Sequence, residues 1–260
     1  MTGGQRWQLM GTAAEIYADH LVPAIFAPWA PVLLDAVGVG PGDAVLDVAC
    51  GTGVVAATAA DRVGPTGTVI GVDLNPGMLA VATARTQRVR WMQADAADLP
   101  FPDGTFDRVL CQAGLQYFPD RLDAVREMRR VLRPGGRLAA LVWGALEHSP
   151  GFAALATALE SVVGLEAGAV MRAPFVFGDD RRSLAELLEA AGLVDVAVEA
   201  RTGEVRFGSV EAFVRYQCAG SPLAALVDPG YVGRLTALVA EGLGDRADFP
   251  IEAAAATGVA

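Results

Sequence analysis

A glycine turn that follows an apolar run holds the first residues suited to ligand binding. The stretch "VLDVACGTGVVA" runs from Val45 to Ala56 and includes one acid, Asp47, before the turn. Its Gly51-x-Gly53-x-x-Ala56 spacing fits the dinucleotide-binding fingerprint. A lone match of this kind is weak. The turn therefore predicts a bound ligand without deciding whether that ligand carries a pyrophosphate.

Two further carboxylates follow the next apolar runs. Asp73 ends "TVIGVD", twenty residues after Gly53, and Asp95 ends "VRWMQAD". A carboxylate at the first position can accept both hydroxyls of a ribose, and one at the second can accept from an adenine amino group. With Asp47, they predict an acidic cleft, which repels a pyrophosphate and suits a cationic ligand that contains adenosine.

These residues need a scaffold that brings strand ends together. Apolar runs alternate with amphipathic stretches, as in a doubly wound parallel sheet. The strands expected for the first half are 45–49, "TVIGVD", "VRWMQAD", "FDRVLCQ" and "RPGGRLAALVW". One helix is expected at 53–63 and another over "RLDAVREMRRVL". Between them we expect a helix with Asn75 as its N-cap and Pro76 at its first position. In such a sheet the ligand binds beyond the carboxyl ends of the strands.

The flanking segments are less regular. Residues 12–37 predict two helical pieces interrupted at Pro23, Pro28 and Pro31. After Trp143 we expect a helix from Phe152 to Val163, a loop "RAPFVFGDD" and a helix at 181–191. Strands at 193–200 and 202–207, forming a hairpin, bring the total to seven. Helices at 209–217 and near 229–242 follow, and small apolar residues at 248–260 predict a flexible tail.

Composition narrows the range of possible functions. The formal net charge is −10, which disfavours nucleic acid as a partner. Three separated cysteines and two histidines predict neither a disulfide framework nor a metal site. No long uncharged run and no leader-like start is visible, so we expect a cytoplasmic protein without a membrane span.

Four motifs occur in order: "LDVACGTG", "VIGVDLNPGML", "ADAADLPFPDGTFDRVLCQAGLQYFPD" and "VLRPGGRLAALVW". Together they resemble class I S-adenosylmethionine-dependent methyltransferases, specifically the UbiE-like small-molecule branch. The motifs cover residues 45–143. The family usually has Gly at the position of Ala49.

The resemblance implies an α/β fold of one domain with a mostly parallel seven-stranded sheet. Its parts are an N-terminal helical lid (1–40), a cofactor-binding core (41–144), a substrate lid insertion (145–180) and a C-terminal part (181–260). The cofactor implied is S-adenosyl-L-methionine. The residues implied to bind it are Tyr17, Asp47, Gly51, Gly53, Asp73, Leu74, Met78, Asp95, Ala96, Cys111 (through its carbonyl), Gln112 and Gln116.

The acceptor is expected to be a lipophilic small molecule, such as a secondary metabolite or quinone-like ring. Candidate lining residues are Phe26, Trp29, Tyr117, Trp143, Phe152, Met171, Phe175 and Phe177. Methyl transfer from a sulfonium needs alignment more than acid–base catalysis, so no catalytic residue is assigned. Weak candidates are His148, Tyr117 and Gln116; a surface position is the plainer interpretation of His148.

Structural explanations compete with several of these assignments. The glycine turn can serve packing alone, Asp47 can be a buried acid held by backbone amides, and Tyr17 can be core. Asp98 is expected to cap the "DAADLPF" turn, and Cys50 to be a small turn residue and not a nucleophile.

Three rival functions remain open. A nicotinamide oxidoreductase would use the same glycine turn, yet the chain has no lysine for a Tyr-x-x-x-Lys pair. A macromolecular methyltransferase would need a basic face. A protein of this fold could also bind the cofactor without methylating, using the lid as a binding or cyclising chamber. A monomer or a homodimer is expected.

Overall fold

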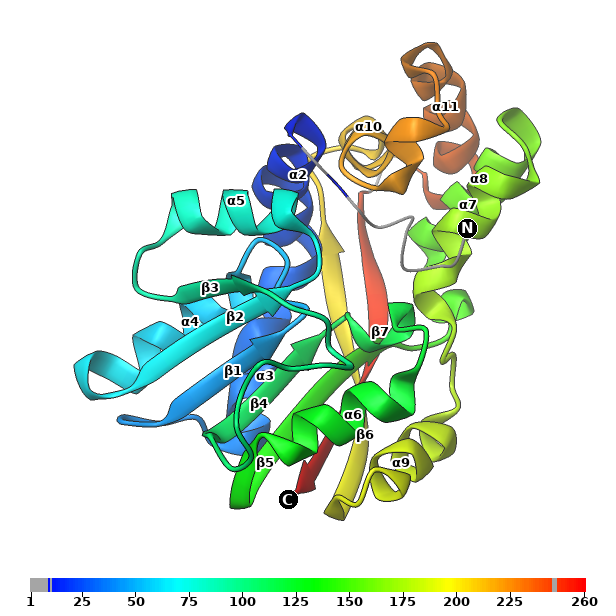
Figure 1. Cartoon of the computed structure of the whole chain (residues 1–260). Coiled ribbons are helices and arrows are strands. Elements are labelled where there is room, and N and C mark those ends of the chain that lie inside the picture. Colours follow the sequence, from blue (N-terminus) through cyan, green and yellow to red (C-terminus); the bar gives the residue numbers. More distant parts are fainter. Residues whose placement is uncertain (1–8, 10, 245–246) are drawn as a thin grey trace.

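The computed structural model describes residue 9, residues 11–244 and residues 247–260. A seven-stranded sheet in the order β3-β2-β1-β4-β5-β7-β6 forms its centre (Figure 1). The strands are β1 Ala44–Val48, β2 Thr68–Asp73, β3 Arg90–Gln93, β4 Phe106–Gln112, β5 Leu132–Trp143, β6 Val194–Arg206 and β7 Asp248–Val259. Strands β1 to β5 pair in parallel, and β7 pairs antiparallel with both β5 and β6. The expected fold class is confirmed.

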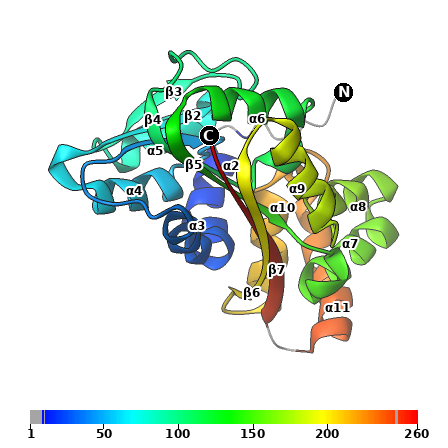
Figure 2. The same ribbon diagram turned by 90° about the horizontal axis from the view of Figure 1, so that it is seen from below.

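Helices cover both faces of the sheet, with α3 and α4 on one face and α6 and α9 on the other (Figure 2). Consecutive strand residues therefore enter different cores: Val45 packs with the first pair of helices and Leu46 with the second. This double burial explains why the parallel strands are continuous apolar runs. The helices that pack on the sheet are α3 Ala30–Val37, α4 Val54–Val63, α5 Pro76–Arg85, α6 Arg121–Arg130 and α9 Arg181–Ala190.

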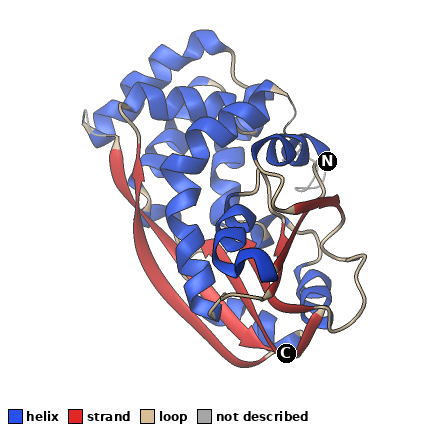
Figure 3. Cartoon of the chain, turned by 90° about the vertical axis from the view of Figure 1, so that its left-hand side faces the viewer, coloured by secondary structure: helices blue, strands red, loops and turns tan. Residues whose placement is uncertain are grey.

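A helical lid stands beyond one end of the sheet (Figure 3). It combines the N-terminal helix with α7 Pro150–Val162, α8 Leu165–Arg172, α10 Val210–Ala219 and α11 Val232–Leu243. Short helical turns adjoin the lid helices: η5 Leu146–His148, η6 Ala173–Phe175, η7 Pro222–Ala225 and η8 Pro229–Tyr231. Two more lie in the core, η3 Gly64–Thr66 before β2 and η4 Leu115–Tyr117 after β4. The lid thus draws on α10 and α11 as well as on the two segments expected from sequence.

The N-terminal helix is continuous, so the expected break into two pieces is wrong. Its parts are α2 Thr12–Ile16, a π-helical stretch η1 Tyr17–Phe26, a 3₁₀ turn η2 Ala27–Trp29, and α3. Proline removes single amide donors, and the chain changes its hydrogen-bond pattern at Pro23 and Pro28 instead of ending the helix. By length and composition this 26-residue helix could cross a membrane, but it packs as a lid helix, with Leu21, Ile25 and Leu33 in the core.

The flexible tail expected at 248–260 is also wrong, because these residues form β7 inside the sheet. Ala253–Ala256 are buried between β5 and β6. Alanine has a low strand propensity, but its small side chain suits a strand covered on both faces. The pairing partners lie far away in sequence, so no local pattern reveals them.

The expected hairpin at 193–207 is instead the single strand β6. Gly203, in the second of the two expected strands, lies in extended pairing with Ile251. A Cβ at Gly203 would lie 2.5 Å from the Trp29 indole. The glycine therefore makes room for Trp29 and does not mark a reversal of the chain.

Candidate active site

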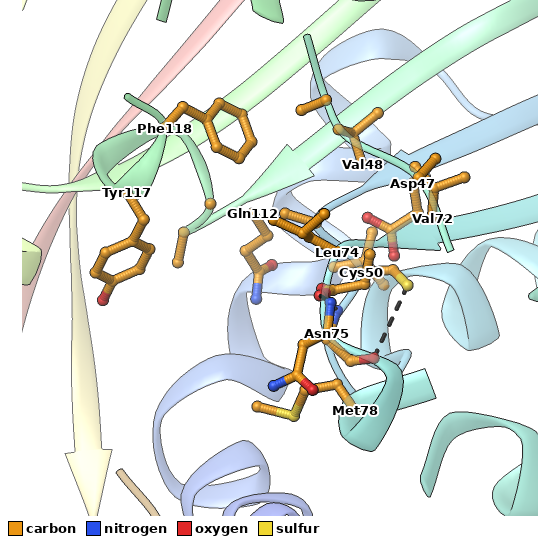
Figure 4. Close-up of a pocket in the computed structure, with 18 of the residues that line it drawn as sticks. Asp47, Val48, Cys50, Val72, Leu74, Asn75, Met78, Gln112, Tyr117 and Phe118 are labelled. Atoms are coloured by element: carbon orange, nitrogen blue, oxygen red, sulfur yellow. Dashed lines mark hydrogen bonds between the residues drawn. The ribbon is translucent and has the colours of Figure 1, made fainter. Parts of the chain in front are cut away.

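A cavity of about 330 Å³ opens at the carboxyl ends of β1, β2 and β4 (Figure 4). Nine of the residues expected to bind the cofactor line it: Tyr17, Asp47, Gly51, Asp73, Leu74, Met78, Asp95, Ala96 and Gln112. Five separate stretches of sequence supply them, and the fold brings these stretches together. Sequence reasoning missed Asn75, Phe118 and Pro119, which also line it.

Asp47 lies inside β1 and is buried, with 1% of its surface exposed. Its Oδ2 accepts a 3.0 Å hydrogen bond from the Ala56 amide, while Oδ1 is buried without a partner among the described residues. Burial raises the pKa of Asp47 to about 8, against the hydrogen bond from Ala56 and together with the charge of Asp73. An unpaired carboxylate oxygen beside a cavity is a site prepared for a hydrogen-bond donor.

Asp73 shapes the turn that faces it. Its Oδ2 accepts from the Gly51 amide and its Oδ1 from the Asn75 amide, each at 2.8 Å. Burial raises the pKa of Asp73, and the hydrogen bonds from Asn75 and Gly51 oppose that rise. Each carboxylate oxygen has a second lone pair, so both can also accept a hydroxyl from a ligand.

Gly51 leaves open space at the cavity. Its φ is +54°, and a Cβ built there would meet no atom within 4 Å, so a ligand can approach the backbone closely. Gly53 does not line the cavity. A Cβ at Gly53 would lie 2.3 Å from the Trp91 ring, so packing explains this glycine.

Apolar side chains line the side of the cavity away from Asp47. Met78 is buried on α5, and Leu74, half exposed, follows β2. Asp95 is exposed and its Oδ1 caps the turn by accepting from the Ala97 amide at 3.0 Å. The cap expected at Asp98 is therefore wrong, because Asp98 contributes its amide, which donates to the Asp95 carbonyl.

The N-terminal helix closes the cavity through Tyr17 and Phe26. Gln112, at the end of β4, donates from Nε2 to the Phe26 carbonyl at 2.9 Å, and its Oε1 is buried without a partner among the described residues. Below the cavity, Asn75 donates from Nδ2 to the Leu9 carbonyl at 2.9 Å. Two amide side chains thus attach the N-terminal segment to the core.

Besides Gly53, two expected cofactor residues, Cys111 and Gln116, lie outside the cavity lining. The Cys111 side chain enters the core on the α6 side of the sheet, where burial raises its pKa to about 12. Gln116 is buried in η4, next to Tyr117. Cys50 lines the cavity, but burial raises the pKa of its thiol well above the ordinary value, which fits the expectation that it is no nucleophile.

A second, smaller cavity of about 40 Å³ adjoins the first through Tyr17, Phe26 and Tyr117, which line both. Among the expected acceptor residues, Phe26, Tyr117, Trp143, Phe152, Met171 and Phe175 line it. Trp29 is buried against Trp143 at a ring distance of 6.0 Å and lines neither cavity. Phe177 lies under the Arg121 guanidinium, also outside both.

His148 lies outside both cavities and is exposed. Its Nδ1 is 2.9 Å from Glu252 Oε2 and 3.6 Å from Asp179 Oδ1. In the described part of the chain these three residues are the one group of potential metal ligands, and their ligand atoms lie within 4.8 Å of one another. These contacts bring both ends of the 145–180 insertion against β7.

Comparisons with known proteins agree with this geometry. Residues 46–140 match a family model described as a methyltransferase domain. A ubiquinone/menaquinone biosynthesis C-methyltransferase, UbiE, of Ectopseudomonas mendocina is 41% identical over 133 residues, or 49% of this chain and 52% of the relative. The chain thus spans about half the length of the relatives it matches.

Solved structures support the fold along nearly the whole chain. Phosphoethanolamine N-methyltransferase 2 of Haemonchus contortus, in complex with S-adenosyl-L-methionine, has a TM-score of 0.62 at 20% identity, covering 95% of this chain and 56% of that one. The [4+2]-cyclase SpnF has a TM-score of 0.55 at 22% identity, covering 90% and 80%. Residues 46–140 are therefore similar in sequence to a methyltransferase domain, and the chain as a whole shares the fold of these solved structures.

Proposed function

We propose that this protein is an S-adenosylmethionine-dependent methyltransferase that acts on a lipophilic small molecule. The observation that carries the proposal is the buried, unpaired Asp47 Oδ1 beside the cavity at the end of β1. A pyrophosphate would bring no hydrogen-bond donor for this oxygen, whereas the ammonium of S-adenosylmethionine would donate to Asp47 and favour the ionised form of its carboxyl group.

The residues present fit this cofactor. Asp47 and the open backbone at Gly51 suit its methionine part, with Gln112 Oε1 as a second unpaired acceptor. Asp73 would accept the ribose hydroxyls. Leu74, Met78 and Ala96 would cover the adenine, whose amino group would donate to Asp95. Cys111 through its carbonyl, Gln116 and Gly53 remain secondary candidates that do not line the cavity.

The bound cofactor would supply a methyl group on a positive sulfur, ready for in-line displacement. The chain's own part is to align the acceptor and exclude water, which can supply most of the acceleration. Tyr17 and Phe26 cover the cavity from the lid, and their rings lie 5.2 Å apart. Gln112 secures that cover through the Phe26 carbonyl.

No side chain at the junction of the cavities is set up as a general base. Burial raises the pKa of Tyr117 well above its ordinary value, helped by the nearby Tyr17, and burial likewise raises the pKa of Tyr17. Both hydroxyls are therefore neutral near pH 7 and suited to donate hydrogen bonds. His148, outside the cavities, is not placed to take a proton from the acceptor.

The acceptor side supports a lipophilic small molecule. The second cavity is lined almost wholly by aromatic and aliphatic side chains. A mostly apolar site with few polar groups is typical of such ligands. Quinone-like rings and secondary metabolites are candidate acceptors, and the net charge of −10 argues against nucleic acid. A monomer or homodimer in the cytoplasm, without a metal ion at the site, completes the proposal.

The test is an assay for transferred methyl. Purified protein is incubated with S-adenosylmethionine carrying a deuterated methyl group and a panel of lipophilic phenols, quinols and amines. We expect one class of acceptor to gain one labelled methyl by mass spectrometry. If an acceptor is converted without this gain, the lid serves a cyclisation or another non-methylating reaction. If NADH supplied in a parallel incubation is consumed instead, the glycine turn belongs to an oxidoreductase.

A further inference from the structure

Gln217 is a polar residue in the mostly apolar lining of the second cavity. It lies near the end of α10 and is 5% exposed. The apolar residues around it come from the N-terminal helix, β5, α7, α8 and η6: Leu21, Ile25, Trp143, Phe152, Val170 and Phe175. A primary amide in such surroundings is expected to find a hydrogen-bond partner.

The Gln217 side chain has no such partner among the described residues. Its backbone carbonyl accepts from Ser221 Oγ at 2.6 Å. Ser221 Oγ also accepts from the Leu223 amide at 3.3 Å, so this hydroxyl is already used to end the helix. Besides the hydroxyls of Tyr17 and Tyr117 at the junction with the larger cavity, the amide of Gln217 is therefore the polar group of this lining that can meet a ligand.

The size of the cavity restricts what reaches Gln217. A volume of about 40 Å³ takes one or two water-sized groups and no aromatic ring. The aromatic junction with the larger cavity, formed by Tyr17, Phe26 and Tyr117, is suited to hold a ring. A ring at this junction would direct a small substituent toward Gln217 while another edge faces the cofactor cavity.

We propose that Gln217 is the residue that selects the acceptor, by hydrogen bonding a carbonyl or hydroxyl oxygen on a planar lipophilic ring held between Tyr17, Phe26 and Tyr117. This inference rests on the proposed function for the placement of the acceptor. It assigns Gln217 a role in specificity and no role in the transfer step. A site built to hydrogen-bond an oxygen rejects an analogue without it, because the amide is then buried unpaired.

The experiment uses phenol and toluene, which have nearly the same shape and differ in a hydroxyl against a methyl group. Both are titrated by ligand-observed NMR into protein saturated with S-adenosylhomocysteine, which fills the larger cavity. We expect wild type to prefer phenol. Methionine has an unbranched side chain of similar length to glutamine. We expect Gln217→Met to bind phenol about tenfold more weakly than wild type does, and to bind toluene no more weakly than wild type does. Gln87→Met makes the same change at an exposed site and should leave the ratio of affinities unaltered.

Stability separates this role from a structural one. Because the Gln217 amide is unpaired in the fold, Gln217→Met should leave the melting temperature unchanged or raise it. A fall of several degrees, or failure to fold, would mean that the amide supports the fold and would overturn the proposal. An unchanged phenol-to-toluene ratio would overturn it as well. The methyl-transfer assay on wild type is read separately, so failure of the function and failure of this inference are distinguishable.

Discussion

Gln112 Nε2 donates to the carbonyl oxygen of Phe26 at 2.9 Å, which connects the end of β4 to the middle of the N-terminal helix. This carbonyl lies where the helix changes from the π-helical stretch η1 to the 3₁₀ turn η2, and the Ala30 amide donates to Ala27 there instead of to Phe26. A break in the helical pattern thus gives the core a point of attachment for its lid.

Replacing Gln112 by Leu should loosen this attachment. The Phe26 carbonyl would lose its partner at a cost of about 1 to 2 kcal/mol. We expect faster amide hydrogen exchange around residues 21–30 than in wild type, with exchange in β4 little changed. Equal exchange in both proteins would show that apolar packing alone holds the lid.

The raised pKa of Asp47 predicts that stability falls as pH rises. Unfolded Asp47 loses its proton near 3.8, whereas the folded protein holds it until about 8. The folded state binds the extra proton in that window, so Asp47 lowers the free energy of unfolding progressively as pH rises from about 4 to 8. Asp47→Asn should remove this loss of stability. Above pH 8 the free energy of unfolding of the variant should exceed that of wild type by roughly 3 kcal/mol.

Urea unfolding of the ligand-free protein at pH 5 and pH 8.5 measures this effect. The difference between variant and wild type is the relevant quantity, since other carboxyls titrate in both. A difference that does not change with pH would contradict a buried, proton-holding Asp47. The same variant should bind S-adenosylmethionine more weakly, because an amide cannot ionise to face the ammonium as the Asp47 carboxyl group can.

Asp73 combines ligand binding with turn formation, and two variants separate these roles. Asp73→Asn keeps an oxygen for one of the two backbone amides, of Gly51 and Asn75, whereas Asp73→Ala frees both. We expect Asp73→Asn to weaken S-adenosylhomocysteine binding at least tenfold with a modest loss of stability. Asp73→Ala should lower the free energy of unfolding by a further ~1 to 2 kcal/mol, the contribution of one more hydrogen bond. Calorimetric titration and thermal melting of both variants give the two quantities. Wild-type affinity in Asp73→Asn would remove Asp73 from the ribose site.

Ala49 and Gly114 are coupled across the ends of β1 and β4. Ala49 has a φ of 56°, and a Cβ at Gly114 would lie 2.6 Å from the Ala49 Cβ. Gly114→Ala alone should destabilise by about 2 kcal/mol, as overpacking does. In the Ala49→Gly background the cost should fall by about 1 kcal/mol. Denaturant unfolding of the four proteins gives the coupling, and additive costs would show that the two sites relax independently.

His148 should contribute little to the rate. It lies on the surface, ion-paired with Glu252, outside both cavities. His148→Ala should retain most of the methyl-transfer activity found for wild type. A loss of two or more decades in kcat, with folding intact, would instead identify it as a general base.

The sequence predicted those parts of the fold that local patterns determine. β2 was expected at its observed bounds, Thr68–Asp73, because a turn precedes its apolar run. The Asn75 cap was also correct, as its side chain accepts from the Gly77 amide. β7 was missed because alanines that suit a strand between two neighbours carry no local strand signal.

The same distinction holds for the residues of the candidate site. Residues at the strand ends were placed correctly around the cavity because sheet topology determines where those ends meet. Gln217 was missed because the site draws on an unexpected lid helix. A signal was present: Val210, Phe213, Val214 and Cys218 form the buried stripe of α10, and Gln217 interrupts it at a position where an apolar residue is the rule.

The most direct test of the account is a calorimetric titration of the purified protein with S-adenosylhomocysteine, with NADH titrated in parallel. An acidic cavity with an unpaired Asp47 oxygen predicts micromolar binding of S-adenosylhomocysteine and none of NADH. Binding of NADH alone would mean that the turn at Gly51 holds a pyrophosphate, and the assignment of the cofactor would be wrong.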